Sequence, residues 1–131
     1  MTVTSGARVG ATTNFALGDF VMADARVVLT TVGILEKAEE MAAQLVDRRL
    51  AACVNIIGPI RSIYRWKGAI ERDQEYLLLI KTTAEQASAL ATAFAELHPY
   101  ELPEHVELAI EGGSVPYLEW LSAQIARETN Q

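Results

Sequence analysis

The stretch ACVNIIGPIRSIYRWKGAIERDQEYLLLIKT, from Ala52 to Thr82, decides the fold of this 131-residue chain. β-Branched and aromatic residues dominate it as far as Trp66, and Lys67-Gly68 supplies a two-residue turn, so the stretch predicts one long β-hairpin. Each arm has about fourteen residues and would span about 46 Å, more than twice an ordinary strand. Part of the hairpin must therefore extend beyond its own sheet. A free two-stranded ribbon is marginal in water, so the sequence predicts support from another subunit.

The segments on either side of the hairpin predict the rest of the fold. The expected elements are a strand over 26–32, a helix over 35–50, a helix over 83–98, a strand over 105–111 and a third helix capped by Ser114. The order β-α-β-β-α-β predicts an α/β chain of the α+β type, a ferredoxin-like sandwich with a long hairpin and an extra C-terminal helix. The strand over 26–32 and the second hairpin arm should be central, and both main helices should cover one face.

Two local patterns add detail to these elements. Gly58-Pro59 interrupts the first hairpin arm, and because proline cannot donate to the ladder, this arm should be bulged there or lie at a sheet edge. Thr83 with Gln86 matches the spacing of a capping box, which predicts a capped start for the second helix.

Composition indicates one globular domain. Half of the residues are apolar, which is enough for a single core over residues 26–131. Residues 1–25 are rich in Thr, Ala and Gly and lack periodicity, so we expect a flexible N-terminal segment. Met22, shortly before the first strand, is a candidate translation start.

Charge and cysteine usage narrow the function classes. The formal net charge is −6, from 11 basic and 17 acidic residues, and the basic residues are scattered, which argues against a nucleic-acid partner. Every apolar run is too short to span a membrane. Cys53 is the only cysteine, which fits a reducing compartment, and we expect a cytoplasmic protein. Phosphate loops, nucleophile elbows and metalloprotease motifs are missing, so we expect no catalysis.

Several separated motifs resemble the CutA family, the divalent-cation tolerance proteins. They are VVLTTV, LAACVNI, SIYRWKGAIE, LLLIKTT, HPYELPE and YLEWL, in this order between about Val27 and Leu121. The resemblance implies a homotrimer of ferredoxin-like subunits, similar in shape to the PII signalling proteins. This expectation agrees with a hairpin that needs support from a neighbour.

The resemblance also implies a metal site. Some family members have copper ligands formed by a cysteine on the first strand and two histidines before the Pro-Tyr pair. The corresponding positions here are Thr30 and Leu97-His98, so only His98 matches. A copper or zinc site needs three or four ligands, and His98 would have to recruit Glu101, Glu104 or a group from another subunit. The alternative is structural, with His98 hydrogen-bonded at the end of its helix.

Four other side chains are candidates for binding or assembly. Lys81 follows an apolar run and, with Tyr100, could form a cleft for a small anion, although an ion pair of Lys81 with a carboxylate is the simpler interpretation. Tyr64 and Trp66 lie near the hairpin turn and are expected to pack at the trimer interface.

The leading interpretation is a non-enzymatic homotrimer for divalent metal-ion tolerance, which needs no cofactor but binds copper or another divalent cation. The first alternative is a PII-like regulatory trimer that binds a small anionic ligand in clefts between subunits. The second is a scaffold trimer that presents its surface to a partner. Neither alternative requires nucleic acid or a membrane.

Overall fold

The computed structural model describes residues 24–125 of the chain. The elements, in order, are β1 (Ala25–Val32), α1 (Leu35–Asp47), β2 (Cys53–Trp66), β3 (Ala69–Thr83), the 3₁₀ turn η2 (Ala84–Gln86), α2 (Ala87–Leu97), β4 (Val106–Ala109) and α3 (Val115–Gln124). The expected β-α-β-β-α-β order with an added C-terminal helix is confirmed. The flexible segment expected over residues 1–25 and the candidate start at Met22 fall almost entirely outside the described residues, although Ala25 itself opens β1.

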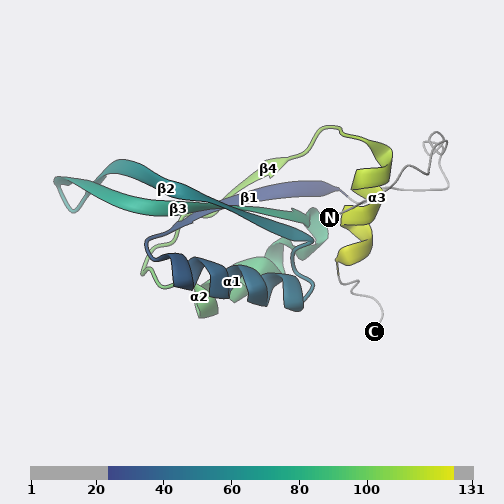
Figure 1. Cartoon of the computed structure of the whole chain (residues 1–131), viewed down its shortest axis with the longest axis horizontal. Helices are drawn as coiled ribbons and strands as arrows, with labels where there is room; N and C mark the ends of the chain where they lie inside the picture. The colour runs from purple at the N-terminus through teal and green to yellow at the C-terminus, as the bar shows by residue number, and fades with distance from the viewer. Residues whose placement is uncertain (1–23, 126–131) are drawn as a thin grey trace.

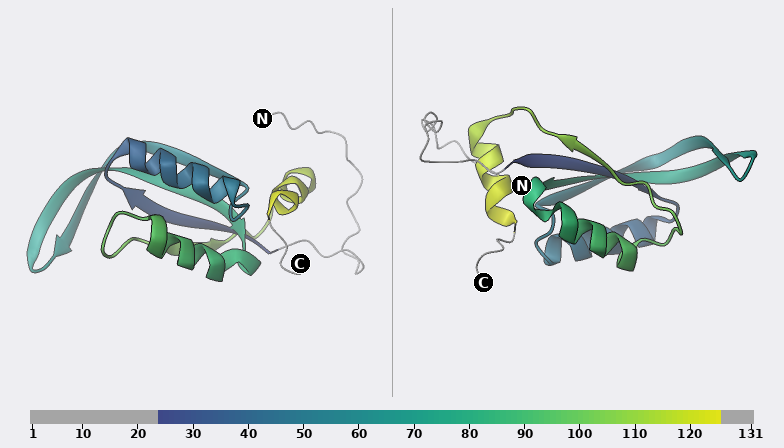
Figure 2. Two further views of the ribbon diagram at one scale, coloured as in Figure 1. Left: turned by 90° about the horizontal axis from the view of Figure 1, so that it is seen from below. Right: turned by 180° about the vertical axis from the view of Figure 1, so that it is seen from behind.

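A single antiparallel sheet carries the fold, with strand order β2-β3-β1-β4 (Figure 1). The predicted central positions of the first strand and the second hairpin arm are therefore correct. Helices α1 and α2 lie side by side on one face of this sheet (Figure 2). Within residues 24–125, no helix combines the length and the apolar character that crossing a membrane requires.

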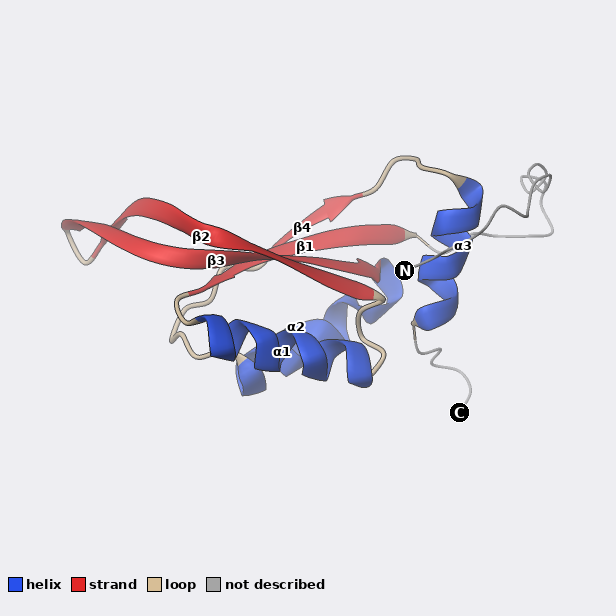
Figure 3. Cartoon of the chain, viewed as in Figure 1, coloured by secondary structure: helices blue, strands red, loops and turns tan. Residues whose placement is uncertain are grey.

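The hairpin extends well beyond the sheet, as its length predicted (Figure 3). β1 pairs with β3 only from Tyr76 to Thr83, whereas β2 pairs with β3 as far as Trp66 and Ala69. The segment 60–75, which we call the ribbon, is thus two-stranded in the described part of the chain. At its tip Lys67 and Gly68 have φ angles of 50° and 84°, the left-handed pair that a tight hairpin turn requires.

A bulge marks the point where the ribbon leaves the sheet. The register of β2 shifts between Ile57 and Ile60, around Gly58-Pro59, and β2 is an edge strand. Both features expected from this proline-containing pair are present. A side chain at Gly58 would meet the ring of Tyr76 at 2.8 Å, so glycine is required by the close approach of β3.

The main core fills the space between the sheet and the two helices. Its buried side chains come from alternate positions of β1 and β3 and from the inner faces of α1 and α2: Val28, Val32, Leu78, Ile80, Met41, Leu45, Leu90 and Phe94. A smaller cluster forms where α3 packs across the end of the sheet, with Leu121 and Ile125 against Ala25 and Ala52. The predicted cap of α3 is confirmed, since Ser114 Oγ accepts a hydrogen bond from the Tyr117 N–H.

Two local predictions were wrong. The first helix ends at Asp47 rather than residue 50, because Arg49 adopts a positive φ of 61° and turns the chain toward β2. The capping box of Thr83 and Gln86 does not form. Thr83 continues β3 and pairs with Ala25, and its buried hydroxyl has no hydrogen-bond partner among the described residues. A further turn, η2, separates Thr83 from α2.

The second face of the sheet is apolar and uncovered by helices α1 and α2. The strand register places one set of aliphatic side chains on this face, and we call it the open sheet face: Val27, Leu29, Ile57, Leu77, Leu79, Val106 and Leu108. Ile57, Val106 and Leu108 are 44 to 49% exposed. An apolar surface of this extent is typical of an interaction site.

We expect Leu45→Ala to lower the free energy of unfolding by about 2–5 kcal/mol, because Leu45 is fully buried between α1 and the sheet. Val46→Ala on the same helix should change it by less than about 0.5 kcal/mol, since Val46 is 42% exposed. Urea unfolding at one fixed protein concentration measures both. Equal losses for the two variants would contradict the placement of α1.

Candidate functional site

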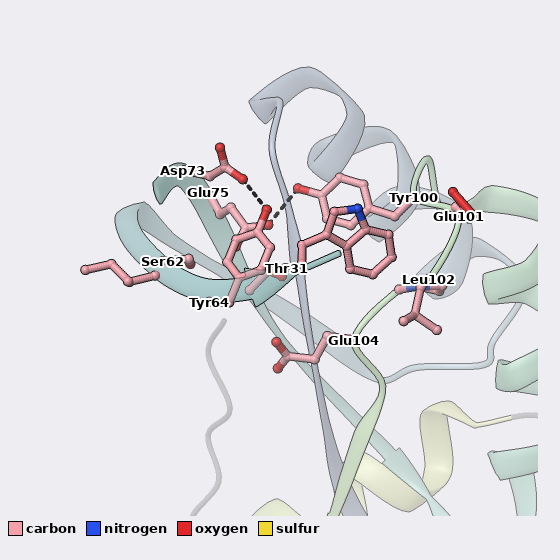
Figure 4. A pocket seen from close by; sticks show the side chains of 12 residues that line it. Thr31, Ser62, Tyr64, Asp73, Glu75, Tyr100, Glu101, Leu102 and Glu104 are labelled. Atoms are coloured by element: carbon pink, nitrogen blue, oxygen red, sulfur yellow. Dashed lines mark hydrogen bonds between the residues drawn. The ribbon is translucent and has the colours of Figure 1, made fainter. Parts of the chain in front are cut away.

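A cleft of about 790 Å³ opens where the ribbon faces the loop between α2 and β4 (Figure 4). We call it the acidic cleft. The ribbon and β1 form one wall, and the loop over residues 100–104 forms the other. Its lining residues are Thr31, Ser62, Ile63, Tyr64, Trp66, Asp73, Glu75, Tyr100, Glu101, Leu102, Pro103 and Glu104.

The strand register explains how one wall becomes acidic and aromatic. Ser62 pairs with Asp73 and Tyr64 pairs with Glu71, so residues at even positions of β2 and odd positions of β3 share one side of the ribbon. This side carries Tyr64 and Trp66 together with the carboxylates of Asp73 and Glu75. The residues on the opposite side include Arg61, Arg65 and Arg72.

The loop supplies the other acidic groups. Helix α2 ends at Leu97, His98 and Pro99 follow it, and the chain runs without helix or strand to β4. Glu101 and Glu104 line the cleft from this loop, with Pro103 between them. The cleft therefore has four carboxylates and no Lys, Arg or His among its lining residues.

Glu75 is the most buried of these carboxylates, with 6% of its surface exposed. Its Oε2 accepts a hydrogen bond from the Tyr100 hydroxyl at 2.6 Å (Figure 4). Burial, followed by this bond and the charge of Glu75, raises the pKa of Tyr100 above its ordinary range, so the phenol stays protonated as a donor. Within residues 24–125, no cation pairs with Glu75.

Tyr64 makes a similar contact at the outer part of the cleft. Its hydroxyl donates a short hydrogen bond to Asp73 Oδ2. This bond is the main cause that raises the pKa of Tyr64 to about 12. The two tyrosine hydroxyls thus point toward the carboxylates of Asp73 and Glu75 on β3 (Figure 4).

His98 lies behind the cleft and is buried, with 8% of its surface exposed. Its Nδ1 accepts a hydrogen bond from the Tyr100 N–H at 3.1 Å, so the ring proton is on Nε2. Nε2 lies 3.1 Å from the carbonyl oxygen of Thr31, to which it donates, and 3.0 Å from Thr30 Oγ1. Burial lowers the pKa of His98 from 6.5, against the opposing effects of the Thr31 carbonyl and the Glu75 charge. The ring therefore joins β1 to the loop as a neutral imidazole.

These contacts show whether the predicted metal ligands can form a site within one chain. The family ligand positions Thr30 and His98 do adjoin, but both nitrogens of His98 are used in hydrogen bonds. Glu101 lines the cleft, whereas His98 is not among the lining residues. In residues 24–125, no three His, Cys, Asp or Glu side chains are grouped closely enough to hold a metal ion. A site built on His98 and Glu101 needs further ligands.

Lys81 and Tyr100 are not neighbours within one chain. Lys81 pairs with Val27 and Cys53, six positions along β3 from the Glu75 that Tyr100 contacts. At about 3.3 Å per residue, this separation is about 20 Å. Cys53 is only partly buried, and its thiol contacts Asn55 Oδ1 at 3.8 Å.

Tyr64 and Trp66, expected at a trimer interface, line the cleft of their own chain. Their partial exposure of 40% and 36% leaves surface for a neighbouring subunit. Sequence reasoning missed Asp73 and Glu75. Their alternation with Glu71 on β3, opposite the aromatic positions of β2, was the available signal.

Comparison with known proteins shows similarity to one protein family. Residues 26–124 match the family model CutA1, described as the CutA1 divalent ion tolerance protein. A Protein CutA homolog from Xenopus laevis is 51% identical over 84 residues, which are 64% of this chain and 56% of that protein. The divalent-cation tolerance protein CutA from Thermus thermophilus is 50% identical over 95 residues, which are 72% of this chain and 92% of that protein. The chain thus spans little more than half the length of the Xenopus relative.

A solved structure agrees with this match. The divalent cation tolerance protein (Cut A1) from Thermus thermophilus superposes with a TM-score of 0.76 and 47% sequence identity. The superposition covers 78% of this chain and 99% of the Thermus chain.

The environment of His98 predicts a pH dependence of stability. Because its pKa is below 6.5 in the folded chain, the unfolded chain takes up the proton first as the pH falls, and the free energy of unfolding decreases. The loss begins near pH 6.5 and is complete below the folded pKa. We expect His98→Gln to reduce the difference in unfolding free energy between pH 7.5 and pH 5.0, measured by urea unfolding. His105→Gln, at an exposed position, is the control; an unchanged difference in His98→Gln would contradict the assignment.

Proposed function

This chain belongs to the CutA1 family of divalent ion tolerance proteins, and from this premise we propose that it serves in divalent-cation tolerance by binding cations as a homotrimer, without catalysis. The family name describes tolerance to ions and carries no enzymatic activity. We place the protein in the cytoplasm, where the partly exposed thiol of Cys53 would stay reduced.

The acidic cleft is the observation that carries this proposal. Four carboxylates face one space with no basic side chain in its lining, so the electrostatic potential there favours cations. Carboxylate oxygens are ligands for divalent cations, and a nearby imidazole would add affinity for copper or zinc. Glu101 is exposed and makes no ion pair with another residue of 24–125, which leaves it available as a ligand.

Association would complete the ligand set. Since one chain groups too few ligands within residues 24–125, the proposed site uses Glu101 with a group from a neighbouring subunit. His98 would join only if its hydrogen bond with Tyr100 or Thr31 opens. Copper is the expected ion on the family resemblance.

The apolar surfaces support the trimer. The open sheet face lacks a covering layer, and the ribbon adds Ile63 and Ile70, which are 65% and 49% exposed. Burial of apolar area contributes about 25 cal/mol per Å², so association would cover surfaces that water disfavours. Three copies arranged in a ring would let each ribbon rest on a neighbour.

Binding of a small anion between subunits is the second candidate. Its support is the position of Lys81 on the same side of the sheet as the open sheet face, where a neighbouring chain would pack. A partner's Tyr100 could then approach Lys81, which it does not approach within one chain. The acidic cleft itself disfavours an anion, so we rank this candidate below cation binding.

Calorimetric titration of the purified chain with Cu(II) and Zn(II) tests cation binding. We expect Glu101→Gln to weaken binding by at least about tenfold, because it removes a ligand charge while keeping the side-chain shape. His98→Gln reports whether the imidazole takes part. Glu36→Gln, on the exposed side of α1, is the matched control and should bind as the wild type does. Absence of a binding signal with both metals would refute cation binding. If the wild type binds inorganic phosphate and Lys81→Gln does not, the second candidate is favoured.

Sedimentation velocity tests the assembly. We expect Leu108→Asp to dissociate the trimer, because it places a charge on the open sheet face, and Trp66→Ala to weaken it. Val46→Asp changes an equally exposed aliphatic residue on the opposite layer and should leave the trimer intact. A wild-type monomer at micromolar concentration, or a trimer indifferent to Leu108→Asp, would contradict the proposed interface.

A further inference from the structure

The acidic cleft has features that a metal ion does not use. Three aromatic side chains, Tyr64, Trp66 and Tyr100, share its lining with the carboxylates. Leu102 and Pro103 form an apolar part of the loop wall. A hydrated metal ion gains little from aromatic rings or aliphatic surface, whereas an organic ligand gains from both.

A site that combines aromatic rings with carboxylates favours organic ammonium ions. Ring faces attract ammonium groups through their quadrupole, and alkylated ammonium groups bind best because their hydration is weak. Trp66 already has such a contact, since the Lys67 ammonium lies 5.6 Å from the centroid of its ring. An alkylammonium ligand would meet the same ring chemistry inside the cleft, with carboxylates to balance its charge.

Glu75 adds a second, independent observation. This carboxylate is more than nine-tenths buried, faces the cleft, and has a tyrosine hydroxyl as its hydrogen-bond partner but no cation within residues 24–125. Buried carboxylates are normally paired with a positive charge, because removal of an ion from water is costly. A cation that enters the cleft would supply the missing charge.

The size of the cleft favours a small molecule. Its volume of about 790 Å³ is within the range of small-ligand pockets and far above the space that one metal ion fills. The cleft lies between two walls, the ribbon and the loop that His98 anchors.

We propose that the acidic cleft binds a small organic cation with an alkylated ammonium group. The ammonium lies among the rings of Tyr64, Trp66 and Tyr100, its charge is balanced by Glu75, Glu101 and Glu104, and the apolar remainder of the ligand contacts Leu102 and Pro103. This site goes beyond divalent-cation tolerance and does not depend on metal binding.

Choline and 3,3-dimethyl-1-butanol form a matched probe pair, since they share a shape and differ by the positive charge. Isothermal titration of the full chain, in buffer with EDTA and no divalent metal, should give choline binding at least about tenfold tighter than that of the neutral alcohol. Intrinsic fluorescence provides a second readout, because Trp66 lies in the cleft and Trp120 in α3.

Variants separate the contributions of charge and ring. The double change Glu101→Gln with Glu104→Gln should weaken choline binding by at least about tenfold, and Trp66→Leu should weaken it more than Trp66→Phe, which keeps a ring. Glu36→Gln on α1 is the control for charge. Sedimentation of each variant at the same concentration shows whether a loss of binding follows a loss of assembly.

Absence of choline binding to the wild-type chain would overturn the proposal, as would equal affinity for choline and the neutral alcohol. A choline affinity unaffected by both the double glutamate change and Trp66→Leu would place the ligand elsewhere and would also overturn it. Failure of the metal titration with retained choline binding would refute cation tolerance through this cleft but support the organic-cation site.

Discussion

The length of the β2–β3 hairpin relative to the strand beside it is the constraint on which the rest of the structure depends. β1 reaches only Tyr76 of β3, and beyond that point the hairpin pairs with itself. A two-stranded ribbon has two faces that its own sheet cannot cover. One face of this ribbon carries the acidic and aromatic groups of the cleft, and the other carries arginine and isoleucine side chains. Both the candidate site and the need for a neighbour therefore result from one difference in strand length.

A chain of hydrogen bonds holds the loop of the cleft against the sheet. The Thr31 carbonyl accepts from His98, His98 accepts from the Tyr100 N–H, and the Tyr100 hydroxyl donates to Glu75. This chain of bonds links β1, the loop after α2 and β3, and its members Thr31, His98 and Glu75 are buried. Removal of one member would leave a buried partner unsatisfied, which costs more than the net value of a single bond. In one chain, His98 therefore acts first as a support for the cleft wall.

The charge pattern of the cleft links the two proposed ligand classes. Divalent metals and organic ammonium ions both need the carboxylates, but only the second class uses the rings of Tyr64, Trp66 and Tyr100. The open sheet face, in contrast, is apolar and suits another protein surface. Glu75 is two positions from Leu77 on β3, so by strand register the cleft continues the side of the sheet that carries the open sheet face.

The sequence by itself determined the elements of this protein and their order in the sheet. Local periodicity, the turn at Lys67-Gly68 and the bulge at Gly58-Pro59 act over a few residues, and chain connectivity then leaves a single reasonable strand order. Local pattern failed at Thr83, where continued strand pairing with Ala25 prevailed over the capping motif. Only the tertiary structure decided that Glu75 meets Tyr100 and that His98 meets Thr30 and Thr31, while Lys81 remains far from Tyr100. These contacts join residues 25 to 68 positions apart. They depend on strand register and on the path of the loop after α2, which no local sequence pattern encodes.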